Sequence, residues 1–315
     1  MSRLSKKAEK DTLITSVKEF GETLSLEIIF EGRSEISISS ISVSRPGLQL
    51  AGYYKHFAND RVQVIGNAEH EYLKSLGSAA RKKSLDDLFK CELPCMIISR
   101  ELEVMPDILE AAKNYNCPLF RSPAITTVLI HDLMLYLNDM LAPTTVVHGE
   151  LLDVSGVGVL ITGEAGIGKS ETALELITHG HRIVADDSVL IKNTGELLVG
   201  TCPNKIRYFM EVRGLGIINV KTMFGPGAIR PEKTVDLVVD LVHWDEKREY
   251  DRLGDEKNSA KLLGVEIPKH IIPVSPGRNI PVIIETAARK YRLEQLGYSA
   301  LDELISLSFA KTDEV

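Results

Sequence analysis

The clearest candidate for chemistry in this sequence is a glycine-rich stretch near the middle of the chain. Residues 163–170 read GEAGIGKS and match G-x-x-x-x-G-K-[ST], the pattern of a phosphate-binding loop, at every fixed position. Glycines let the backbone point successive N–H groups at an anion, and Lys169 adds a mobile positive charge for terminal phosphates. The Ser170 hydroxyl is a suitable ligand for Mg²⁺. The predicted ATP-binding loop consists of Gly163, Glu164, Ala165, Gly166, Ile167, Gly168, Lys169 and Ser170.

The sequence on either side of the loop supports this interpretation. The apolar run VGVLIT precedes it and the helix-forming run KSETALELI follows it, which is the strand–loop–helix context of a phosphate-binding loop. The competing interpretation is a glycine-rich turn that binds nothing.

Two adjacent acids, Asp186 and Asp187, follow one predicted helix later at the end of RIVADD. If RIVA is a strand running back toward the loop, its C-terminal end presents both acids beside the phosphates. One carboxylate can then organise metal-bound water while the other accepts the proton of an attacking hydroxyl. This division favours transfer to an alcohol over simple hydrolysis. The alternative is that both acids cap a turn and face solvent.

Other candidate residues lie on predicted strands and loops. His148 lies in VVHGELLDV, where a lone histidine is usually structural, although beside two acids it can tune their protonation. Glu211 and Arg213 precede a Gly-x-Gly turn. Arg252 in DRLG and Arg278 in SPGRN are arginines of the type that neutralises charge in phosphoryl transfer. By spacing alone, most such arginines are surface residues.

Composition limits the classes of function. The 315 residues are 44% hydrophobic and 26% charged, which is typical of a folded globular protein. A net charge of −7 argues against nucleic acid as a partner. No apolar run approaches the roughly 20 residues that span a bilayer, so we expect no membrane association. The basic start lacks the apolar core of a secretory signal and the four cysteines are scattered, so we expect a cytoplasmic location.

Alternating strand and helix patterns predict an α/β fold with two domains. In residues 1–130, strands are expected at LSLEIIFEG, RVQVIG, CMIISR and CPLF, with helices at AEHEYLKSL and DILEAAKNYN. A helix that begins at Ser122–Pro123 and stops before Pro143 should link the domains. In residues 131–315, TTVVHGELLDV, GVGVLITG and TVDLVVDLVHW are expected strands, the last with one buried face, and two helices close the chain. The segment SRPGLQLAGYY is a predicted tight connection without assigned chemistry.

Taken together, these segments resemble the HPr kinase/phosphorylase family over nearly the whole chain. The specific elements are the loop through GHRIVADD, then EVRGLGIINV, YDRLG and SPGRN, whereas the first domain is similar only diffusely, through SRPGLQLAGYY and DRVQVIG. The resemblance implies ATP-dependent phosphorylation of a serine in the phosphocarrier protein HPr, and its reversal by phosphorolysis, in which phosphate attacks phosphoserine and pyrophosphate leaves. It also implies a role in regulating carbon metabolism, a homohexamer, and a kinase domain related to phosphoenolpyruvate carboxykinase.

The resemblance also implies roles for single residues. Asp187, paired with His148, would take the serine proton during phosphorylation and donate one during the reverse reaction. Lys169 would hold the phosphates and Arg252 would be the catalytic arginine.

For the metal and its surroundings, the resemblance implies Ser170 and Glu211 around Mg²⁺, with the 273–278 loop important chiefly for dephosphorylation. The supporting residues are Asp186, Arg213, Pro273, Val274, Ser275, Pro276, Gly277 and Arg278. Ala165 stands where the family usually has serine, which removes one hydroxyl but keeps the backbone nest.

Two alternatives of a different class stay open. A small-molecule kinase or carboxykinase-like phosphotransferase would turn over without a protein substrate. A non-catalytic nucleotide sensor would use ATP to bias assembly, with Asp187 only structural. The first domain is expected to serve assembly or regulation.

Overall fold

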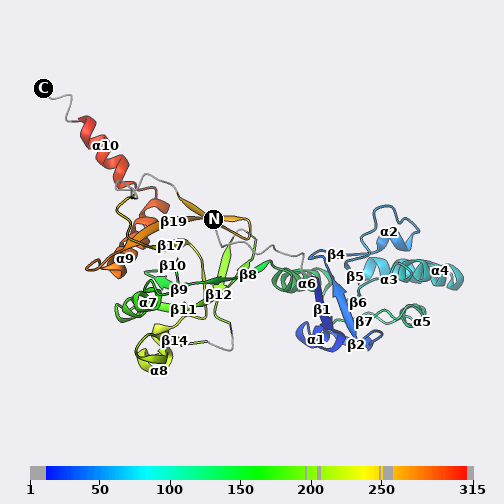
Figure 1. Cartoon of the computed structure of the whole chain (residues 1–315). Coiled ribbons are helices and arrows are strands. Elements are labelled where there is room, and N and C mark those ends of the chain that lie inside the picture. The colour runs from blue at the N-terminus through cyan, green and yellow to red at the C-terminus, as the bar shows by residue number, and fades with distance from the viewer. Residues whose placement is uncertain (1–11, 196, 204–206, 248–249, 251–257, 311–315) are drawn as a thin grey trace. The chain divides into compact units, whose positions relative to one another are not determined.

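The computed structural model in Figure 1 describes residues 12–195, 197–203, 207–247, 250 and 258–310. Helices and strands alternate along this part of the chain, which confirms the predicted α/β fold class. Within the same residues, no helix is both long and apolar enough to cross a lipid bilayer.

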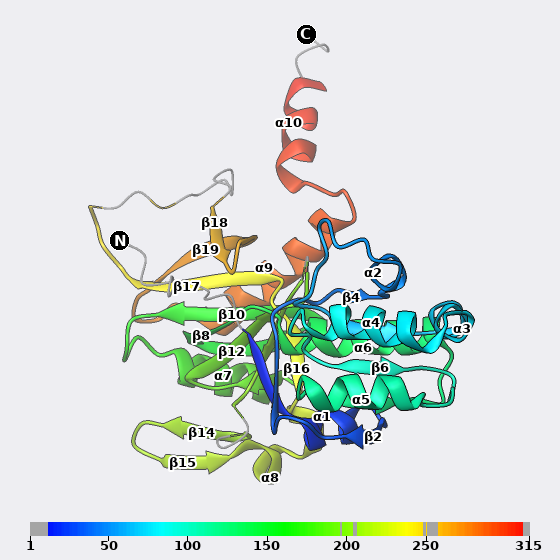
Figure 2. The same cartoon turned by 90° about the vertical axis from the view of Figure 1, so that its right-hand side faces the viewer.

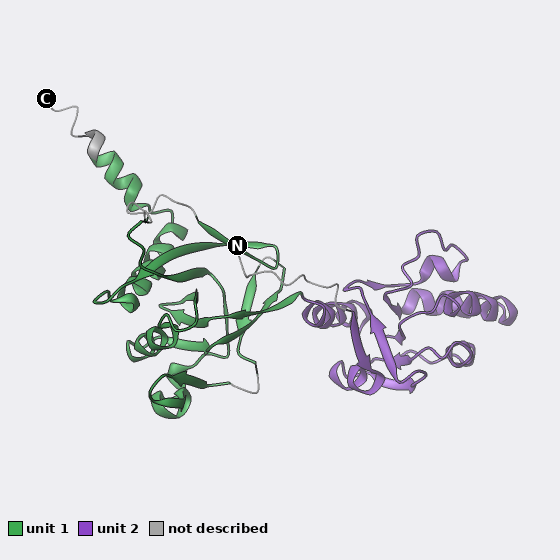
Figure 3. Cartoon of the chain, viewed as in Figure 1, with its two compact units in different colours: residues 1–8, 143–315 green, residues 9–142 purple. Residues whose placement is uncertain are grey.

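The chain forms two compact units, which Figure 3 colours separately. Unit 2 covers residues 9–142, and unit 1 covers residues 143–315 with 1–8. The sequence-based boundary after residue 130 falls inside helix α6 (Thr126–Met140). Leu129, Leu133 and Leu137 of α6 pack in the core of unit 2, and the whole helix belongs to that unit.

Unit 2 is built on a five-stranded sheet. Its strands are β2 (Glu27–Phe30), β4 (Val43–Ser44), β5 (Val62–Ile65), β6 (Met96–Ile98) and β7 (Leu119–Arg121). A separate two-stranded ribbon is formed by β1 (Leu13–Ser16) and β3 (Glu35–Ile38). The order is β2-β7-β6-β5-β4, parallel except for β2 at one edge. Besides α6, the helices are α1 (Val17–Thr23), α2 (Gly47–Leu50), α3 (Asn67–Ser75), α4 (Ser78–Phe89) and α5 (Pro106–Asn114). Apolar clusters lie on both faces of the sheet, so β5 is buried at every position.

The predicted strands and helices of this unit are present, but one predicted helix start is wrong. Helix α6 begins at Thr126 rather than at Ser122–Pro123, because the backbone is still extended at Ile125. Helix α4 was not predicted, because few residues of its sequence SAARKKSLDDLF are apolar and they form only a weak stripe. The helix packs on α5 in the folded unit.

Unit 1 contains two stacked sheets and a hairpin. Its strands are β8 (Thr144–His148), β9 (Glu150–Val154), β10 (Val157–Gly163), β11 (Arg182–Ala185), β12 (Ser188–Asn193), β13 (Leu198–Thr201), β14 (Phe209–Val212), β15 (Gly216–Asn219), β16 (Glu232–Thr234), β17 (Leu237–His243), β18 (Ser259–Leu262) and β19 (Val265–Val274). The larger sheet has the order β11-β9-β10-β17-β19-β18, and the smaller has β16-β13-β12-β8. Figure 2 shows the β14–β15 hairpin beside the body of this unit.

Helices cover one face of the larger sheet and the smaller sheet covers the other. The helices of unit 1 are α7 (Lys169–Thr178), α8 (Val220–Phe224), α9 (Ile280–Gln295) and α10 (Ala300–Ala310), with a 3₁₀ turn at Pro226–Ala228. Helices α7 and α9 share one apolar cluster with β10 and β17, and a second cluster joins the two sheets. Helix α10 projects from the rest of the unit in both views (Figures 1 and 2).

The prediction of one buried face for TVDLVVDLVHW is wrong. Leu237 and Val239 of β17 pack toward the helices, whereas Val238 packs toward the second sheet. Both faces are buried because β17 is a central strand between two layers.

The expected single strand TTVVHGELLDV is broken at Gly149, and this break positions the candidate site. Strand β8 belongs to the smaller sheet and β9 to the larger one. The chain crosses between the same two sheets a second time at Asp186–Asp187, between β11 and β12. The Gly149 amide donates to the Asp187 carbonyl oxygen at 3.2 Å, so the two crossovers lie side by side.

The crossover at Gly149 has no room for a side chain. A Cβ there would lie 2.4 Å from the carbonyl oxygen of Ile161. We therefore expect Gly149→Ala to lower the free energy of unfolding by about 1–3 kcal/mol, measured by urea denaturation. Gly227→Ala is the control, because a Cβ at Gly227 meets nothing within 4 Å. Equal stability of the two variants would contradict this account of the crossover.

Candidate active site

The predicted phosphate-binding loop joins the end of β10 to the start of α7, as the flanking sequence indicated. Gly163, Gly166 and Gly168 have φ values of 150°, 87° and 101°, a region that favours glycine. Ile167 is buried in the core beneath the loop and anchors it. The Lys169 ammonium lies 3.5 Å from the Gly163 carbonyl oxygen, so the lysine folds back over its own loop. The loop therefore has the backbone conformation that an anion nest requires.

Two buried carboxyl groups lie beside the first turn of α7. Glu150 is 1% exposed, and its Oε1 accepts from the Ser170 hydroxyl at 3.3 Å. Asp186 is 7% exposed, and its Oδ2 accepts from the Glu211 backbone amide at 3.2 Å. The other oxygen of each carboxyl, Glu150 Oε2 and Asp186 Oδ1, is buried without a hydrogen-bond partner among the described residues. A buried, unsatisfied carboxylate is unfavourable unless a proton or a cation compensates it.

The protonation of these two acids reflects their surroundings. Burial, together with the nearby charge of Asp186, raises the pKa of Glu150 to about 8, although Lys169 opposes the shift. Burial also raises the pKa of Asp186 to about 6, against the lowering effect of the Glu211 amide. The pair thus favours holding a proton at neutral pH when no cation is present.

The residues present fit a Mg²⁺ ion. Mg²⁺ takes one or two protein carboxylates and completes its shell with water and substrate phosphate oxygens. The free oxygens of Glu150 and Asp186, next to the Ser170 hydroxyl, offer that donor set. Throughout the described ranges, no group of three or more His, Cys, Asp and Glu side chains is arranged to hold a metal.

Glu150 was not among the residues singled out in the sequence. It lies 20 positions before Ser170, and sequence reasoning assigned it only to a strand. The available signal was an acid at the start of the strand-forming run ELLDV, directly after a His-Gly pair. A carboxylate that enters a buried strand needs a compensating partner.

His148 and Asp187 meet at the paired crossover. His148 Nδ1 lies 3.3 Å from the backbone oxygen of Asp187. The Asp187 side chain is exposed, and its charge contributes to raising the pKa of both Glu150 and Asp186. Its φ of 59° is unusual for a residue other than glycine, and such strain is concentrated at functional sites.

The β14–β15 hairpin brings two further predicted residues to the loop. A Cβ at Gly166 would lie 2.7 Å from Arg213 Nη1, so the guanidinium packs directly on the phosphate-binding loop. Glu211 approaches through its backbone amide on Asp186, while its side chain is exposed. Gly166 therefore leaves the space that the Arg213 guanidinium, from another segment, occupies.

The segment 273–278 lies at the same edge of the larger sheet as the loop. Strands β10, β17 and β19 are parallel, and Gly163, Leu241 and Ile272 are in register across them. Pro273 and Val274 end β19, and Ser275, Pro276, Gly277 and Arg278 lead into α9. Ligands bind at the carboxyl edge of such parallel strands. Arg252 lies outside the described residues.

The sequence matches two family models that together span most of the chain. Residues 15–137 match the HPr Serine kinase N terminus, and residues 139–307 match the HPr Serine kinase C-terminal domain. The chain belongs to the HPr serine kinase family.

Curated relatives agree with this assignment. The HPr kinase/phosphorylase of Caldanaerobacter subterraneus subsp. tengcongensis is 46% identical over 94% of this chain and 96% of its own length. That of Alkaliphilus metalliredigens is 50% identical over 84% of this chain and 86% of its own. A solved structure of the Hpr(Ser) kinase/phosphatase from Coxiella burnetii is 38% identical, covering 51% of this chain and 98% of its own, with a TM-score of 0.47.

The raised pKa of Glu150 predicts a pH-dependent effect of removing its charge. Because the folded state holds this proton more tightly, the carboxyl should favour folding below its ordinary pKa and oppose it increasingly as pH rises toward about 8. With EDTA present, Glu150→Gln should therefore raise the melting temperature at pH 8 more than at pH 5. Scanning calorimetry at both pH values measures the difference.

Glu175→Gln, at an exposed position on α7, is the control and should show no such difference. A Glu150→Gln effect that is equal at both pH values would contradict the assignment.

Proposed function

We propose that this chain transfers the terminal phosphoryl group of ATP to a serine of HPr and reverses the reaction by phosphorolysis. One observation carries the proposal: the phosphate-binding loop, two buried carboxyls with free oxygens and the exposed Asp187 lie together at one edge of unit 1. Membership of the HPr serine kinase family, and relatives named HPr kinase/phosphorylase, support it. The activity would serve the regulation of carbon metabolism in the cytoplasm.

The chain's own groups would divide the work between binding and proton transfer. The backbone amides of the loop and Lys169 bind the phosphates, and Arg213 adds positive charge beside Gly166. Asp187 accepts the proton of the serine hydroxyl as its oxygen attacks phosphorus, with His148 tuning the acid. In the reverse direction a phosphate oxygen attacks the phosphoserine, the serine oxygen leaves with a proton from Asp187, and pyrophosphate is released.

Mg²⁺ is the implied cofactor. Ser170, Asp186 and Glu150 would hold it or its waters, and Glu211 would join them from the hairpin. When bound, the ion neutralises charge on the phosphate oxygens. Ligation by the carboxylates would also release the protons that burial favours.

The arrangement of the rest of the protein is part of the proposal. Unit 1 would form the kinase domain, and unit 2 would serve assembly or regulation in a homohexamer. Arg252 and the 273–278 loop would act in the reaction, the loop chiefly in dephosphorylation. The position of the loop after β19, at the carboxyl edge of the sheet, supports its part in the site.

Asp187→Asn tests the catalytic base. Asparagine tolerates the left-handed backbone at this position, so the fold should be kept. We expect the rate of phosphoserine formation on HPr with Mg-ATP to fall by about 10²–10⁴. ATP affinity, measured by calorimetry, should be largely retained. An unchanged rate would contradict the role of Asp187 as the base. ATP binding without phosphoserine formation, in the unaltered protein as in the variant, would support a nucleotide sensor in which Asp187 is only structural.

The reverse reaction is tested by its products. Phosphorylated HPr and excess phosphate should yield one pyrophosphate for each phosphoserine lost. Orthophosphate as the sole product would reject phosphorolysis. ATP turnover on small molecules without HPr, and none with it, would instead favour the small-molecule phosphotransferase.

A further inference from the structure

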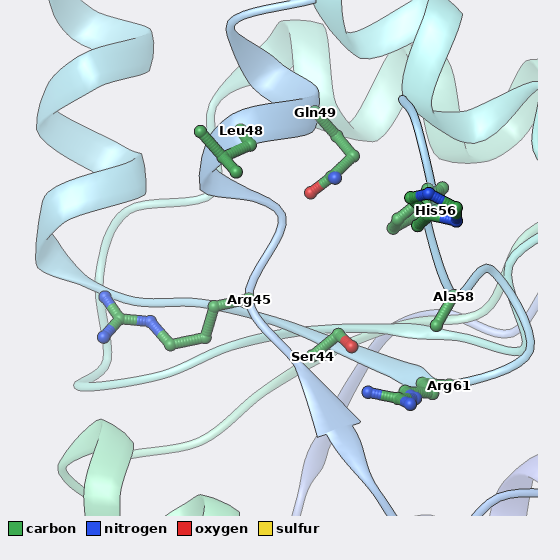
Figure 4. Close-up of a pocket in the computed structure, with 8 residues that line it drawn as sticks. Ser44, Arg45, Leu48, Gln49, His56, Ala58 and Arg61 are labelled. Atoms are coloured by element: carbon green, nitrogen blue, oxygen red, sulfur yellow. The ribbon is translucent and has the colours of Figure 1, made fainter. Parts of the chain in front are cut away.

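A polar hollow of about 240 Å³ lies in unit 2, in the part of the chain that begins with SRPGLQLAGYY. Side chains from the end of β4, from α2 and from the following loop line it (Figure 4). Among them, Ser44, Gln49, His56 and Arg61 carry polar groups that border the same space. None of these residues belongs to the candidate active site.

Arg61 is the unusual member of this group. It is half-buried, and its Nε is buried without a hydrogen-bond partner. Across the described residues, no carboxylate lies within ion-pair distance of its guanidinium. Arg45 also lines the hollow, but its charge is paired, because its Nη2 lies 2.7 Å from a carboxylate oxygen of Glu69. The hollow therefore contains one cationic fork whose charge no described side chain neutralises.

Hydrogen bonds from a buried glutamine side chain fix the backbone that carries this arginine. Gln63 is 0% exposed, and its Nε2 donates to the carbonyl oxygens of Ala58 at 3.2 Å and Arg61 at 2.9 Å. On the opposite side, Gln49 Nε2 donates to the Tyr53 carbonyl oxygen at 3.2 Å. These bonds hold the two sides of the hollow in place, so a ligand would not have to order them on binding.

His56 contributes a second polar side chain to the hollow. Its φ of 60° lies in the left-handed region, which histidine adopts more readily than most residues other than glycine. The imidazole at this position is exposed and borders the hollow.

We propose that this hollow binds a small phosphorylated anion through the Arg61 guanidinium. A guanidinium matches phosphate oxygens with two parallel N–H donors, and a desolvated, unpaired one gains most from such an anion. The Ser44 hydroxyl and the His56 ring supply further hydrogen bonds to phosphate oxygens. The volume lies below the range of about 300–1,000 Å³ that is usual for larger ligands, which favours a phosphate on a short carbon chain.

The test uses hydrogen–deuterium exchange of the full-length chain, because it separates this site from the phosphate-binding loop. Inorganic phosphate and glycerol 3-phosphate are the probes, and glycerol is the neutral control. Each probe is used at up to about 10 mM, ten times a millimolar Kd. We expect peptides covering residues 44–61 to exchange more slowly with either phosphate compound and not with glycerol. Peptides covering residues 163–170 report the other site in the same sample.

Arg61→Gln should raise the concentration of glycerol 3-phosphate that gives half-maximal protection of residues 44–61 by at least about tenfold. Protection of residues 163–170 should not change. Arg121→Gln is the matched control, because it removes one positive charge from unit 2 outside the hollow and should leave both responses as they are. If exchange without ligand shows that Arg61→Gln unfolds unit 2, His56→Asn replaces it, since asparagine tolerates the same backbone, with an expected loss of about threefold.

Each result of the exchange experiment leads to a different conclusion about the hollow. Tighter binding of glycerol 3-phosphate than of inorganic phosphate would assign the hollow to a phosphorylated metabolite, and equal binding would assign it to the phosphate group alone. No protection of residues 44–61 by either compound would overturn the proposal. Protection that survives both Arg61→Gln and His56→Asn would overturn it as well. Failure of HPr phosphorylation would leave this result untouched, because the two sites share no residue.

Discussion

The backbone hydrogen bond from the Gly149 amide to the Asp187 carbonyl oxygen ties together the two places where the chain passes between the sheets of unit 1. Each crossover ends the regular pairing of a strand, so each releases side chains that the sheet would otherwise pack in its interior. His148 lies exposed at the end of β8 beside one crossover, and Asp187 lies exposed at the other. Only glycine fits at position 149, because the Ile161 carbonyl oxygen occupies the space of a side chain. The catalytic geometry proposed here thus depends on a steric constraint in the backbone.

The same crossovers create the electrostatic imbalance of the site. Glu150 begins β9 directly after the first crossover, and Asp186 directly follows β11 at the second, so both carboxyls are buried near one another. The fold leaves one oxygen of each without a donor and places Ser170 and Lys169 next to them. Protons can compensate this negative charge in the free protein, and a magnesium ion with nucleotide phosphates can replace them. A site of this kind couples nucleotide binding to proton release.

Unit 2 has a charge imbalance of the opposite sign. Where unit 1 buries acids with too few partners, the hollow in unit 2 holds the guanidinium of Arg61 without a described carboxylate. Buried polar groups are normally satisfied, so each exception calls for a physical explanation. In unit 1 the explanation proposed is a cation with its phosphates, and in unit 2 it is an anion. Both are matched to a charge that the protein itself leaves uncompensated.

The sequence by itself determined the phosphate-binding loop, the α/β class and the strands and helices with a clear apolar pattern, because these depend on residues that are neighbours along the chain. A loop at Gly163–Ser170 needs glycines at fixed spacing, and apolar periodicity indicates a helix or strand locally. Tertiary structure alone decided that Gly149 divides one apparent strand between two sheets, and that Glu150 faces Ser170 across 20 residues of sequence. It also decided that Arg213 packs on the loop whereas Arg61 has no described partner. Burial and charge compensation are properties of segments brought together by folding, and no local pattern in the sequence records them.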